Sequence, residues 1–265
     1  MIRLVMCIAM AILLSGCEDT DVGMAIQAGA DAVRAITLDD DDLRRLAEDI
    51  AAESDRRHVM ARPDHPQARR LAGLTDGLKG YQGQEFDFKV YLSPTVNAFA
   101  MADGTIRIYG GLMDMMTDDE LLFVIGHEMG HVVENHVREK IVLAYAGSAV
   151  RKAIASQQNE AGQIARSVFG ALAESLLNAQ FSQKEEREAD DFGVRFLESA
   201  GGNRQAAVSA LTKLATLGGD HSFLSSHPAP EARAKRLQAK PDDDGPPKNR
   251  SWADRSLGWL KRFLL

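Results

Sequence analysis

The sequence has little cysteine, no long hydrophobic run and no concentration of positive charge. Its composition, 45% hydrophobic and 26% charged residues in 265, excludes disorder and collagen-like repetition and is ordinary for a globular protein with one domain of roughly 200 residues or two small ones. The apolar run at residues 4–14 is about half of the ~20 residues that a membrane-spanning helix needs. Lys and Arg number 31 against 38 Asp and Glu, without the basic cluster that phosphate-backbone binding requires, so no nucleic acid is expected as a partner.

The N-terminus has the layout of a secretory signal peptide, with a positive end, the apolar run and then small residues. The tetrapeptide Leu-Ser-Gly-Cys that ends at Cys17 resembles the lipobox of bacterial lipoproteins, in which the chain is cut before the cysteine and the thiol is diacylated. We therefore predict a signal peptide at residues 1–16 and a lipid-anchored tether at residues 17–36, with simple secretion or a permanent anchor as alternatives. Because Cys7 would leave with the peptide, Cys17 would be the only cysteine of the mature chain, which could form no intramolecular disulfide.

The hydrophobic pattern predicts a mainly helical α+β domain over residues 37–240. A hydroxyl and several carboxylates open a helix at residues 37–58, and these carboxylates fit a solvated helix start better than a metal site. Alternating apolar residues over 85–92 predict a half-buried strand, and Asp103-Gly104 is a favoured hairpin turn. The other expected elements are short strands at 97–100 and 105–109, joined by that turn, and helices at about 184–199, 203–217 and 230–239.

Three further segments complete the predicted organisation. Residues 141–183 are rich in apolar side chains, but charged residues interrupt them, so we expect an amphipathic helical excursion and not a membrane span. Residues 241–250, with an Asp triplet and paired prolines, are expected to be a linker. Residues 251–265 are predicted to form a C-terminal amphipathic helix, which either docks on the protein's own surface or lies in a membrane interface.

The residues most indicative of chemistry lie in a helix that opens with a capping-box pattern, Thr117 to Glu120. Its early residues are apolar on all sides, so the helix is expected to be buried. His127 and His131 follow at positions i and i+4, share one face and can offer imidazole nitrogens to one zinc ion. Glu128 can then reach a metal-bound water without being a ligand. The alternative, satisfied core histidines, is disfavoured because two imidazoles and a carboxylate would rarely enter so apolar a stretch without a partner.

The third ligand of such a site is not encoded next to the motif. The position that carries the third histidine of a metzincin is Val137 in this chain. His136 lies about 180° around the helix from His127, so we expect it to be an exposed surface histidine. The remaining ligand must therefore come from elsewhere in the chain.

A strongly acidic helix is the best source of that ligand, because zinc accepts a carboxylate. Glu186 and Asp190 lie four residues apart and share a face with Ala189 and Gly193, whose small side chains would let this helix approach the first one closely. Glu188 points the opposite way. A solvated acidic face is the alternative for this helix, although it explains Glu186 and Asp190 poorly.

Several stretches between about residues 85 and 237 carry a family resemblance. They are Val96-Asn97-Ala98-Phe99-Ala100, Ile108 with Gly110-Gly111-Leu112, Gly126 to His131 with Asn135-His136, Ser182 with Glu186-Arg187-Glu188-Ala189-Asp190, and Ser226-His227-Pro228 with Glu231 and Arg233. In these stretches the chain resembles the M48 family of zinc metallopeptidases, of CAAX-type and HtpX-like proteases, and within it the periplasmic lipoprotein members. The resemblance implies a gluzincin-type fold with a small sheet packed beside the HExxH helix. It also implies that His127, His131 and Glu186 are metal ligands, that Glu128 is the general base, and that Asp190 orients a ligand histidine.

The resemblance suggests roles outside the metal site as well. Gluzincins bind an extended peptide along a strand edge, which here would be the strand of Asn97, Ala98 and Phe99, although Asn97 is about equally well explained as a turn residue. His227 is the first candidate and Arg233 the second for a donor to the oxyanion. In periplasmic members a histidine like His227 latches the site shut as a zinc ligand, and an ordinary turn residue is the alternative. The turn at 101–104 departs from the Pro-Gly-Gly of many relatives, which puts only the hairpin geometry in doubt.

These features predict a zinc endopeptidase, with one Zn²⁺ per chain, held on the membrane by lipidated Cys17 and facing the periplasm of a Gram-negative-type bacterium. Unfolded or mislocalised envelope proteins are the expected substrates, by family and location. Glu18 is not the aspartate associated with inner-membrane retention, so the outer membrane is favoured. The alternatives are a latent protease and a metal-stabilised chaperone or binding module with little proteolysis, although a pure scaffold would not need a base at Glu128.

Overall fold

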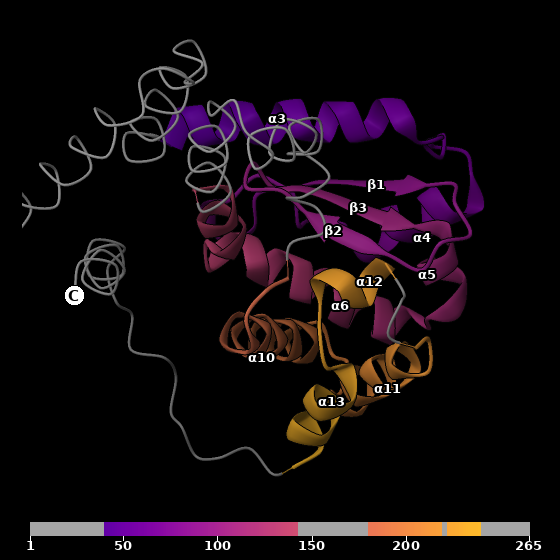
Figure 1. Ribbon diagram of the computed structural model, residues 1–265. Coiled ribbons are helices and arrows are strands. Elements are labelled where there is room, and N and C mark those ends of the chain that lie inside the picture. Colours follow the sequence, from indigo (N-terminus) through magenta and orange to yellow (C-terminus); the bar gives the residue numbers. More distant parts are fainter. Residues whose placement is uncertain (1–39, 143–179, 219–221, 240–265) are drawn as a thin grey trace, which may run out of the picture.

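The computed structural model describes residues 40–142, 180–218 and 222–239, in which helices enclose a small sheet (Figure 1). Helix α3 covers one face of the sheet, α6 lies against the other, and α10, α11 and α13 pack beyond α6 (Figure 1). The predicted fold class, mainly helical α+β, is confirmed. In chain order the elements are α3 (Asp40–Arg57), α4 (Pro66–Leu74), the 3₁₀ turn η1 (Tyr81–Gly83), β1 (Asp87–Tyr91), β2 (Ala98–Ala100), β3 (Thr105–Tyr109), α5 (Gly110–Met115), α6 (Asp118–Val133), α10 (Gln183–Ser199), α11 (Arg204–Ala215), α12 (Ser222–Ser226) and α13 (Pro230–Gln238).

The sheet has the strand order β1, β3, β2, with β1 parallel and β2 antiparallel to the central strand. The predicted hairpin between β2 and β3 is present, and Met101 N–H donates to the carbonyl oxygen of Thr105 at 2.8 Å. Gly104 in its turn has a φ of 90°, and a Cβ there would lie 1.7 Å from the carbonyl oxygen of Glu85, so this position requires glycine. Among the described strands β2 is an edge, with one side unpaired.

The end of β1 is buried on both faces, at Val90 and Tyr91, whereas Asp87 and Lys89 nearer its start are exposed. The pattern places Tyr91 on the polar side, but its side chain is fully buried because α3 lies over that face. Its hydroxyl donates to Asp55 Oδ1 of α3 at 2.7 Å, and Arg107 Nε of β3 donates to the same oxygen at 2.8 Å. Burial alone would raise the pKa of Asp55, but the hydrogen bonds from Arg107 and Tyr91 hold it below its ordinary value. This cluster of Asp55, Tyr91 and Arg107 joins α3 to the sheet.

Helices α6 and α10 both begin at capping boxes. In the predicted box at α6, the backbone N–H of Thr117 donates to Glu120 Oε2 at 2.7 Å. Ser182 and Glu185 repeat the arrangement at α10, with a distance of 2.6 Å. The expected burial of α6 is also confirmed, since nearly every residue from 120 to 132 is buried.

Small residues let α6 and α10 pack closely against each other. A Cβ on Gly126 would lie 3.1 Å from Cα of Gly193, and a Cβ on Gly130 would lie 3.1 Å from Cα of Ala189. The close approach expected from Ala189 and Gly193 of α10 is therefore present. Gly126 and Gly130 are the small residues of α6 that face them. This contact sets the acidic side chains of α10 against the histidines of α6.

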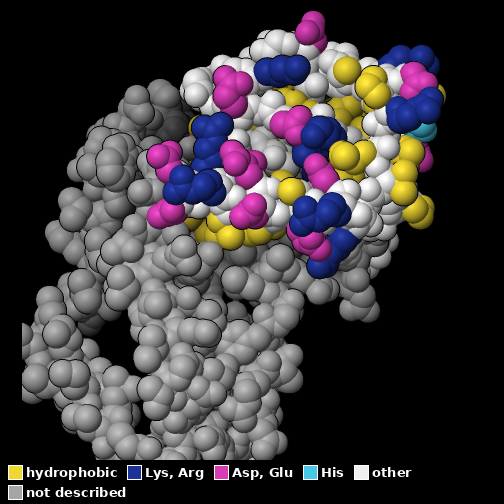
Figure 2. Space-filling model, turned by 90° about the horizontal axis from the view of Figure 1, so that it is seen from above, with side chains coloured by type: hydrophobic (Ala, Val, Ile, Leu, Met, Phe, Trp, Pro, Cys, Tyr) yellow, Lys and Arg dark blue, Asp and Glu magenta, His cyan; other side chains and the backbone are white. Residues whose placement is uncertain are grey.

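The exposed face of α3 carries charges of both signs. Ion pairs at i, i+3 and i, i+4 spacing run along the helix, among them Arg44–Glu48 at 3.3 Å and Arg57–Glu53 at 2.8 Å. Such exposed pairs each stabilise a helix by about 0.2–0.5 kcal/mol. Figure 2, seen from the side of α3, shows basic and acidic side chains interspersed on this face.

No helix within residues 40–142, 180–218 and 222–239 is long and apolar enough to cross a membrane. The predicted signal peptide at 1–16, Cys17 with the tether at 17–36, most of the excursion at 141–183, the linker at 241–250 and the helix at 251–265 lie outside these residues. These parts of the organisation stay predictions.

Candidate active site

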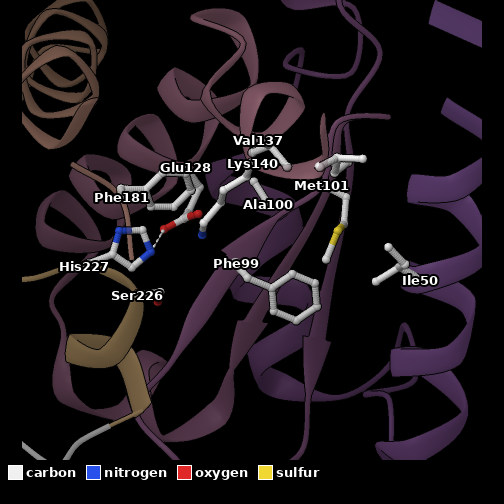
Figure 3. A pocket seen from close by; sticks show the side chains of 11 residues that line it. Ile50, Phe99, Ala100, Met101, Glu128, Val137, Lys140, Phe181, Ser226 and His227 are labelled. Atoms are coloured by element: carbon white, nitrogen blue, oxygen red, sulfur yellow. Dashed lines mark ion pairs between the residues drawn. The ribbon is translucent and has the colours of Figure 1, made fainter. Parts of the chain in front are cut away.

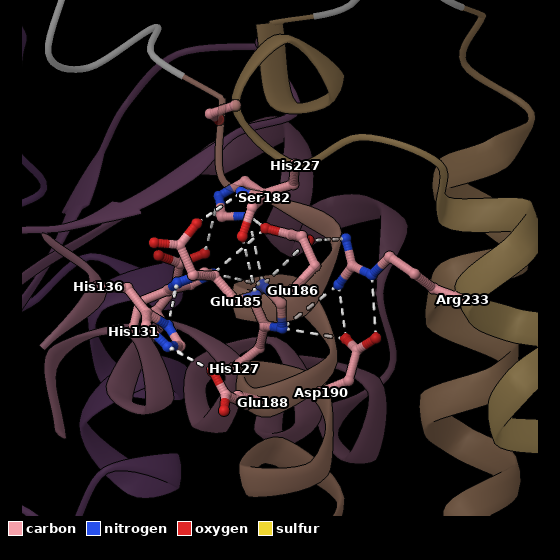
Figure 4. Close-up of polar contacts among 12 residues, drawn as sticks. His127, His131, His136, Ser182, Glu185, Glu186, Glu188, Asp190, His227 and Arg233 are labelled. Carbon is pink, nitrogen blue, oxygen red and sulfur yellow. Dashed lines mark hydrogen bonds and ion pairs between the residues drawn. The ribbon is translucent and has the colours of Figure 1, made fainter. Parts of the chain in front are cut away.

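Three histidines and one glutamate from distant parts of the chain meet where α6, α10 and the residues after α12 come together (Figure 4). They are His127, His131, Glu186 and His227, each at most 1% exposed, and one ligand atom of each lies within 4.8 Å of the others. His127 Nε2 lies 3.1 Å from His131 Nε2 and 3.3 Å from His227 Nδ1. Glu186 Oε1 lies 3.4 Å from His131 Nε2 and 3.0 Å from His227 Nδ1. The cluster combines residues that are up to 100 positions apart in the sequence.

The donor set and its spacing fit a zinc ion. Atoms that bind Zn²⁺ tetrahedrally at about 2.1 Å are roughly 3.4 Å apart. The four distances above lie close to this spacing, and His127 Nε2 lies 3.8 Å from the second carboxylate oxygen, Glu186 Oε2. Burial lowers the pKa of His131 well below its ordinary value, so the ring is neutral and one nitrogen keeps a lone pair. Lone pairs and a carboxylate that converge in a buried space repel one another unless a cation lies between them, so these residues form a metal-binding His/Glu cluster.

Asp190 and Arg233 lie beside the cluster, on the right in Figure 4. Asp190 Oδ1 lies 3.1 Å from His127 Nδ1, so this nitrogen carries the proton and Nε2 is left to face the cluster. Arg233 donates to Asp190 from Nε at 3.0 Å and from Nη2 at 2.6 Å, and its Nη1 contacts Glu186. Burial alone would raise the pKa of Glu186, but the Arg233 guanidinium, with His227 and His131, holds it well below its ordinary value. Arg233 is thus engaged by two carboxylates, which differs from the oxyanion role considered for it.

The prediction that His136 is an exposed surface histidine is wrong. Its side chain is 3% exposed, with Nδ1 3.1 Å from His131 Nδ1 and Nε2 3.3 Å from Glu188 Oε2. The helical-wheel argument fails because α6 ends at Val133 and Asn135 has a left-handed φ of 64°, which redirects the chain before helix resumes at residue 136. The hydrogen bond from His136 lowers the pKa of Glu188 to about 2, so Glu188 is an ionised partner of a buried ring and more than a solvated side chain.

A pocket beside the cluster contains the side chains of Glu128 and His227 (Figure 3). Glu128 Oε1 lies 3.4 Å from His227 Nε2, on the side of the imidazole that faces away from the cluster. Phe99 of β2 and Met101 after it contribute apolar side chains to the opposite wall of the pocket (Figure 3). The pocket therefore brings together an apolar strand edge and the carboxylate that follows the first histidine of the motif.

Lys140 and Phe181 also line this pocket, and the sequence patterns singled out neither of them. Lys140 Nζ lies 3.5 Å from the centroid of the Phe181 ring, and that ring stacks on His131 with 3.7 Å between the centroids. Burial lowers the pKa of Lys140 to about 8. The available sequence signals were weak: Phe181 directly precedes the Ser182 cap, and the resemblance had already included Asn135-His136 beside Lys140.

The unpaired side of β2 offers backbone groups beside the pocket. Tyr109 N–H donates to the carbonyl oxygen of Asn97 at 3.0 Å. In an antiparallel pair every second residue directs its backbone N–H and C=O to the partner strand, so Asn97 and Phe99 face β3. The backbone N–H and C=O of Ala98 and Ala100 therefore point away from β3. Ala98 N–H donates to Asn97 Oδ1 at 3.0 Å, so Asn97 makes the local hydrogen bond of a turn residue, while Phe99 supplies a side chain to the pocket.

Comparisons with known proteins agree with the geometry of the cluster. The sequence model of Peptidase family M48 matches residues 65–240. Metalloprotease LoiP of Escherichia coli (strain K12) is 38% identical over 245 residues, which are 91% of this chain and 97% of LoiP. Metalloprotease YcaL of the same organism is 39% identical over 234 residues, 86% of this chain and 92% of YcaL. The Beta-barrel assembly-enhancing protease of that organism is 28% identical over 161 residues, 56% of this chain and 33% of its own length.

The family match covers both helices of the cluster and the residues after α12, and the similarity to LoiP and YcaL extends over most of the chain. A buried His/Glu cluster with a carboxylate directly beside it is the arrangement that a metalloprotease requires. Protein chains are accordingly its substrates. The chain belongs to peptidase family M48 and is a metalloprotease.

Proposed function

We propose that the protein is a zinc-dependent endopeptidase of the bacterial cell envelope, with His127, His131 and Glu186 as ligands and Glu128 as general base. The position of Glu128 carries this proposal. Its carboxylate lies in the pocket beside the cluster and is not one of the four cluster residues. A metal-stabilised chaperone would have no use for a carboxylate at that place.

The chain's own residues supply the other parts of the mechanism. A zinc ion in this cluster would contribute Lewis acidity and lower the pKa of water toward about 7. Glu128 takes the proton of the attacking water and returns it to the leaving amine. Asp190 accepts the Nδ1 proton of His127 and so keeps the other ring nitrogen directed at the cluster. Arg233 balances the negative charge of Asp190 and Glu186.

The edge of β2 is the proposed docking site for the substrate backbone. The carbonyl of Ala98 and both backbone polar groups of Ala100 face away from β3 and can pair with an extended peptide. Such pairing holds a chain regardless of its sequence. Preference would then come from the pocket that Phe99 and Met101 line, which favours apolar substrate side chains.

The place of His227 supports a latent resting state. Its Nδ1 stands among the ligand atoms, while its Nε2 faces the base Glu128. A zinc site closed by four protein ligands is the structural type, whereas a catalytic site keeps one position for water. Activation would then require the segment that ends at His227 to move, and Gly218, with a φ of 81°, is the proposed hinge.

The variant His227→Ala separates the possible roles of this residue. We expect casein cleavage to rise, because a ligand position becomes available to water. A fall in cleavage would instead indicate a donor to the oxyanion. Unchanged activity together with unchanged zinc affinity would show that His227 does neither.

The envelope location and the substrate class are proposed from the N-terminal sequence and from one relative. The lipobox-like tetrapeptide ending at Cys17 favours a lipid anchor, and the outer membrane is proposed because Glu18 is not aspartate. A similar protein is named for β-barrel assembly, which favours unfolded or mislocalised envelope proteins as substrates. If the anchor is correct, Cys17→Ser should release the protein from the membrane fraction, and an unchanged distribution would contradict it.

The proposed activity is tested by zinc quantification and casein cleavage with the full chain and with Glu128→Gln. Glutamine keeps the shape of the side chain but cannot act as a base, so zinc content should stay the same while cleavage falls by ~10²-fold or more. The matched control is Glu48→Gln, which changes an exposed glutamate of α3 that pairs only with Arg44 among described side chains. Wild-type cleavage by Glu128→Gln would refute the mechanism.

A further inference from the structure

The two motif histidines use different partners for their second ring nitrogens. His127 Nδ1 meets a carboxylate directly, at 3.1 Å from Asp190. His131 Nδ1 meets another imidazole, His136, whose far nitrogen in turn lies 3.3 Å from the carboxylate of Glu188. Lys184 Nζ also donates to Glu188, at 3.0 Å. The side chains from His131 to Lys184 thus form a continuous chain of polar contacts.

Only one arrangement of protons satisfies every contact in this chain while His131 Nε2 faces the cluster. Nε2 must carry a lone pair there, so His131 Nδ1 carries the proton and donates to His136 Nδ1. His136 then holds its own proton on Nε2 and donates it to Glu188. In the reverse arrangement His131 would present an N–H to the cluster and His136 would present a lone pair to a carboxylate.

The backbone is shaped to bring His136 into this position. Asn135 adopts a left-handed φ of 64°, a conformation that few residues other than glycine and asparagine tolerate. The next helical segment starts at His136, which is 3% exposed even though Asn135 is exposed. Both nitrogens of this buried ring have partners, so its orientation against His131 is fixed.

We propose that His136 is a positioning residue that, together with Glu188, orients His131 and strengthens metal binding. This inference rests on the proposed metal site, because His136 acts through the ligand His131 and does not touch the metal. Outer partners of ligand histidines fix the ring and its tautomer, and their loss typically weakens metal affinity about 10–100-fold.

Two substitutions at His136 distinguish hydrogen bonding from packing. His136→Leu keeps an apolar side chain of similar bulk but removes the acceptor, and we expect its zinc dissociation constant to rise about 10–100-fold. His136→Asn places an oxygen acceptor near the former Nδ1, and it should stay within about threefold of the wild type. Dissociation constants are measured by chelator competition on the full chain, and the visible spectrum of the Co²⁺-loaded chain reports whether the ligand geometry changes.

His58→Leu is the matched control for loss of a bonded histidine. His58 Nδ1 contacts the carbonyl oxygen of Ser54 at 2.9 Å, and its ring stacks on Tyr91, which joins α3 to the sheet and is not part of the cluster. This variant should lower the melting temperature without changing zinc affinity. A second pair serves if His136→Leu does not fold: Glu188→Leu should weaken zinc binding several-fold, whereas Glu198→Leu, on the same helix and paired with Arg204, should not.

Two results would overturn the inference. In the first, His136→Leu, or Glu188→Leu where the former does not fold, binds zinc as tightly as the wild type. In the second, His136→Asn is as weak as His136→Leu, which would assign the loss to packing. A wild-type chain that binds no zinc would instead refute the proposed metal site, so the two failures are distinguishable.

Discussion

Replacing Gly193 by alanine tests whether the close contact of α6 and α10 determines the metal site. A Cβ at this position would lie 3.0 Å from the backbone nitrogen of His127 and 3.0 Å from the backbone oxygen of Phe123. Both are main-chain atoms of a buried helix, so they cannot rotate aside as a side chain can. Helix α10 must therefore shift away from α6, and it carries Glu186 and Asp190 with it.

The expected loss of stability is moderate and measurable. Overpacking of this kind costs about 1–3 kcal/mol, and alanine in place of glycine inside a helix returns up to ~1 kcal/mol. The net loss of about 1–2 kcal/mol corresponds to a fall of roughly 2–8 °C in melting temperature for a domain of this size. Zinc affinity should fall as well, because His127 and Glu186 lie on the two helices that separate. Thermal unfolding and chelator competition measure the two effects.

Gly73→Ala is the matched control for this prediction. Gly73 is exposed in α4, and no described atom lies within 4 Å of the place of its Cβ. Alanine there should raise the melting temperature by about 1–4 °C and leave zinc affinity unchanged. If Gly193→Ala is stabilised in the same way, the helices have room for a methyl group and the reasoning is refuted.

Two further predictions concern carboxylates, one in the contact between α3 and the sheet and one in the metal cluster. Asp55→Asn should lower stability at pH 7 by about 3 kcal/mol, because Arg107 loses one of its carboxylates. Folding depresses the pKa of Asp55, so its carboxylate stabilises the folded state above pH ~3.9 and this stabilisation is lost as the pH falls through the depressed pKa. The difference in melting temperature between wild type and variant should therefore shrink below about pH 4. A difference that stays constant with pH would contradict this. Glu186→Ala should abolish stoichiometric zinc binding, whereas Glu188→Ala should weaken it only several-fold; the opposite order would mean that the wrong glutamate was chosen.

The sequence predicted what depends on short-range spacing. The HExxH pattern places His127 and His131 on one face of a helix, and the capping box marks where that helix begins. Glu186 and Asp190 could be linked to this helix because Ala189 shares their face and allows close packing. Each of these conclusions uses residues within a few turns of one another, where helical geometry is fixed.

What the sequence did not predict depends on contacts or backbone angles that helical and strand periodicity do not describe. His136 was misplaced because the regular helix ends two residues before the left-handed Asn135, and a single such φ cancels any extrapolation around the helix. Tyr91 was misplaced because its cover, α3, comes from a segment 36 residues earlier, where Asp55 lies. The partners of Arg233 were not predicted, because they lie 43 and more residues away and periodicity carries no information over that separation.

The burial that makes the cluster suitable for a metal also closes it to a peptide. Glu128 and His227 are each 1% exposed, so hydrolysis requires a rearrangement that uncovers them. The ligand helices α6 and α10 pack against each other along their length, and moving them would dismantle the site. Apart from its contacts with the cluster and Glu128, His227 is held by α12 and Phe181: its ring stacks on Phe223 of α12 with 4.6 Å between the centroids, and the carbonyl oxygen of Ser226 accepts a hydrogen bond from Phe181 N–H at 3.0 Å. A movement of α12 would withdraw His227 from the cluster and leave the contact between α6 and α10 in place, which is the physical reason to assign the proposed latch to His227.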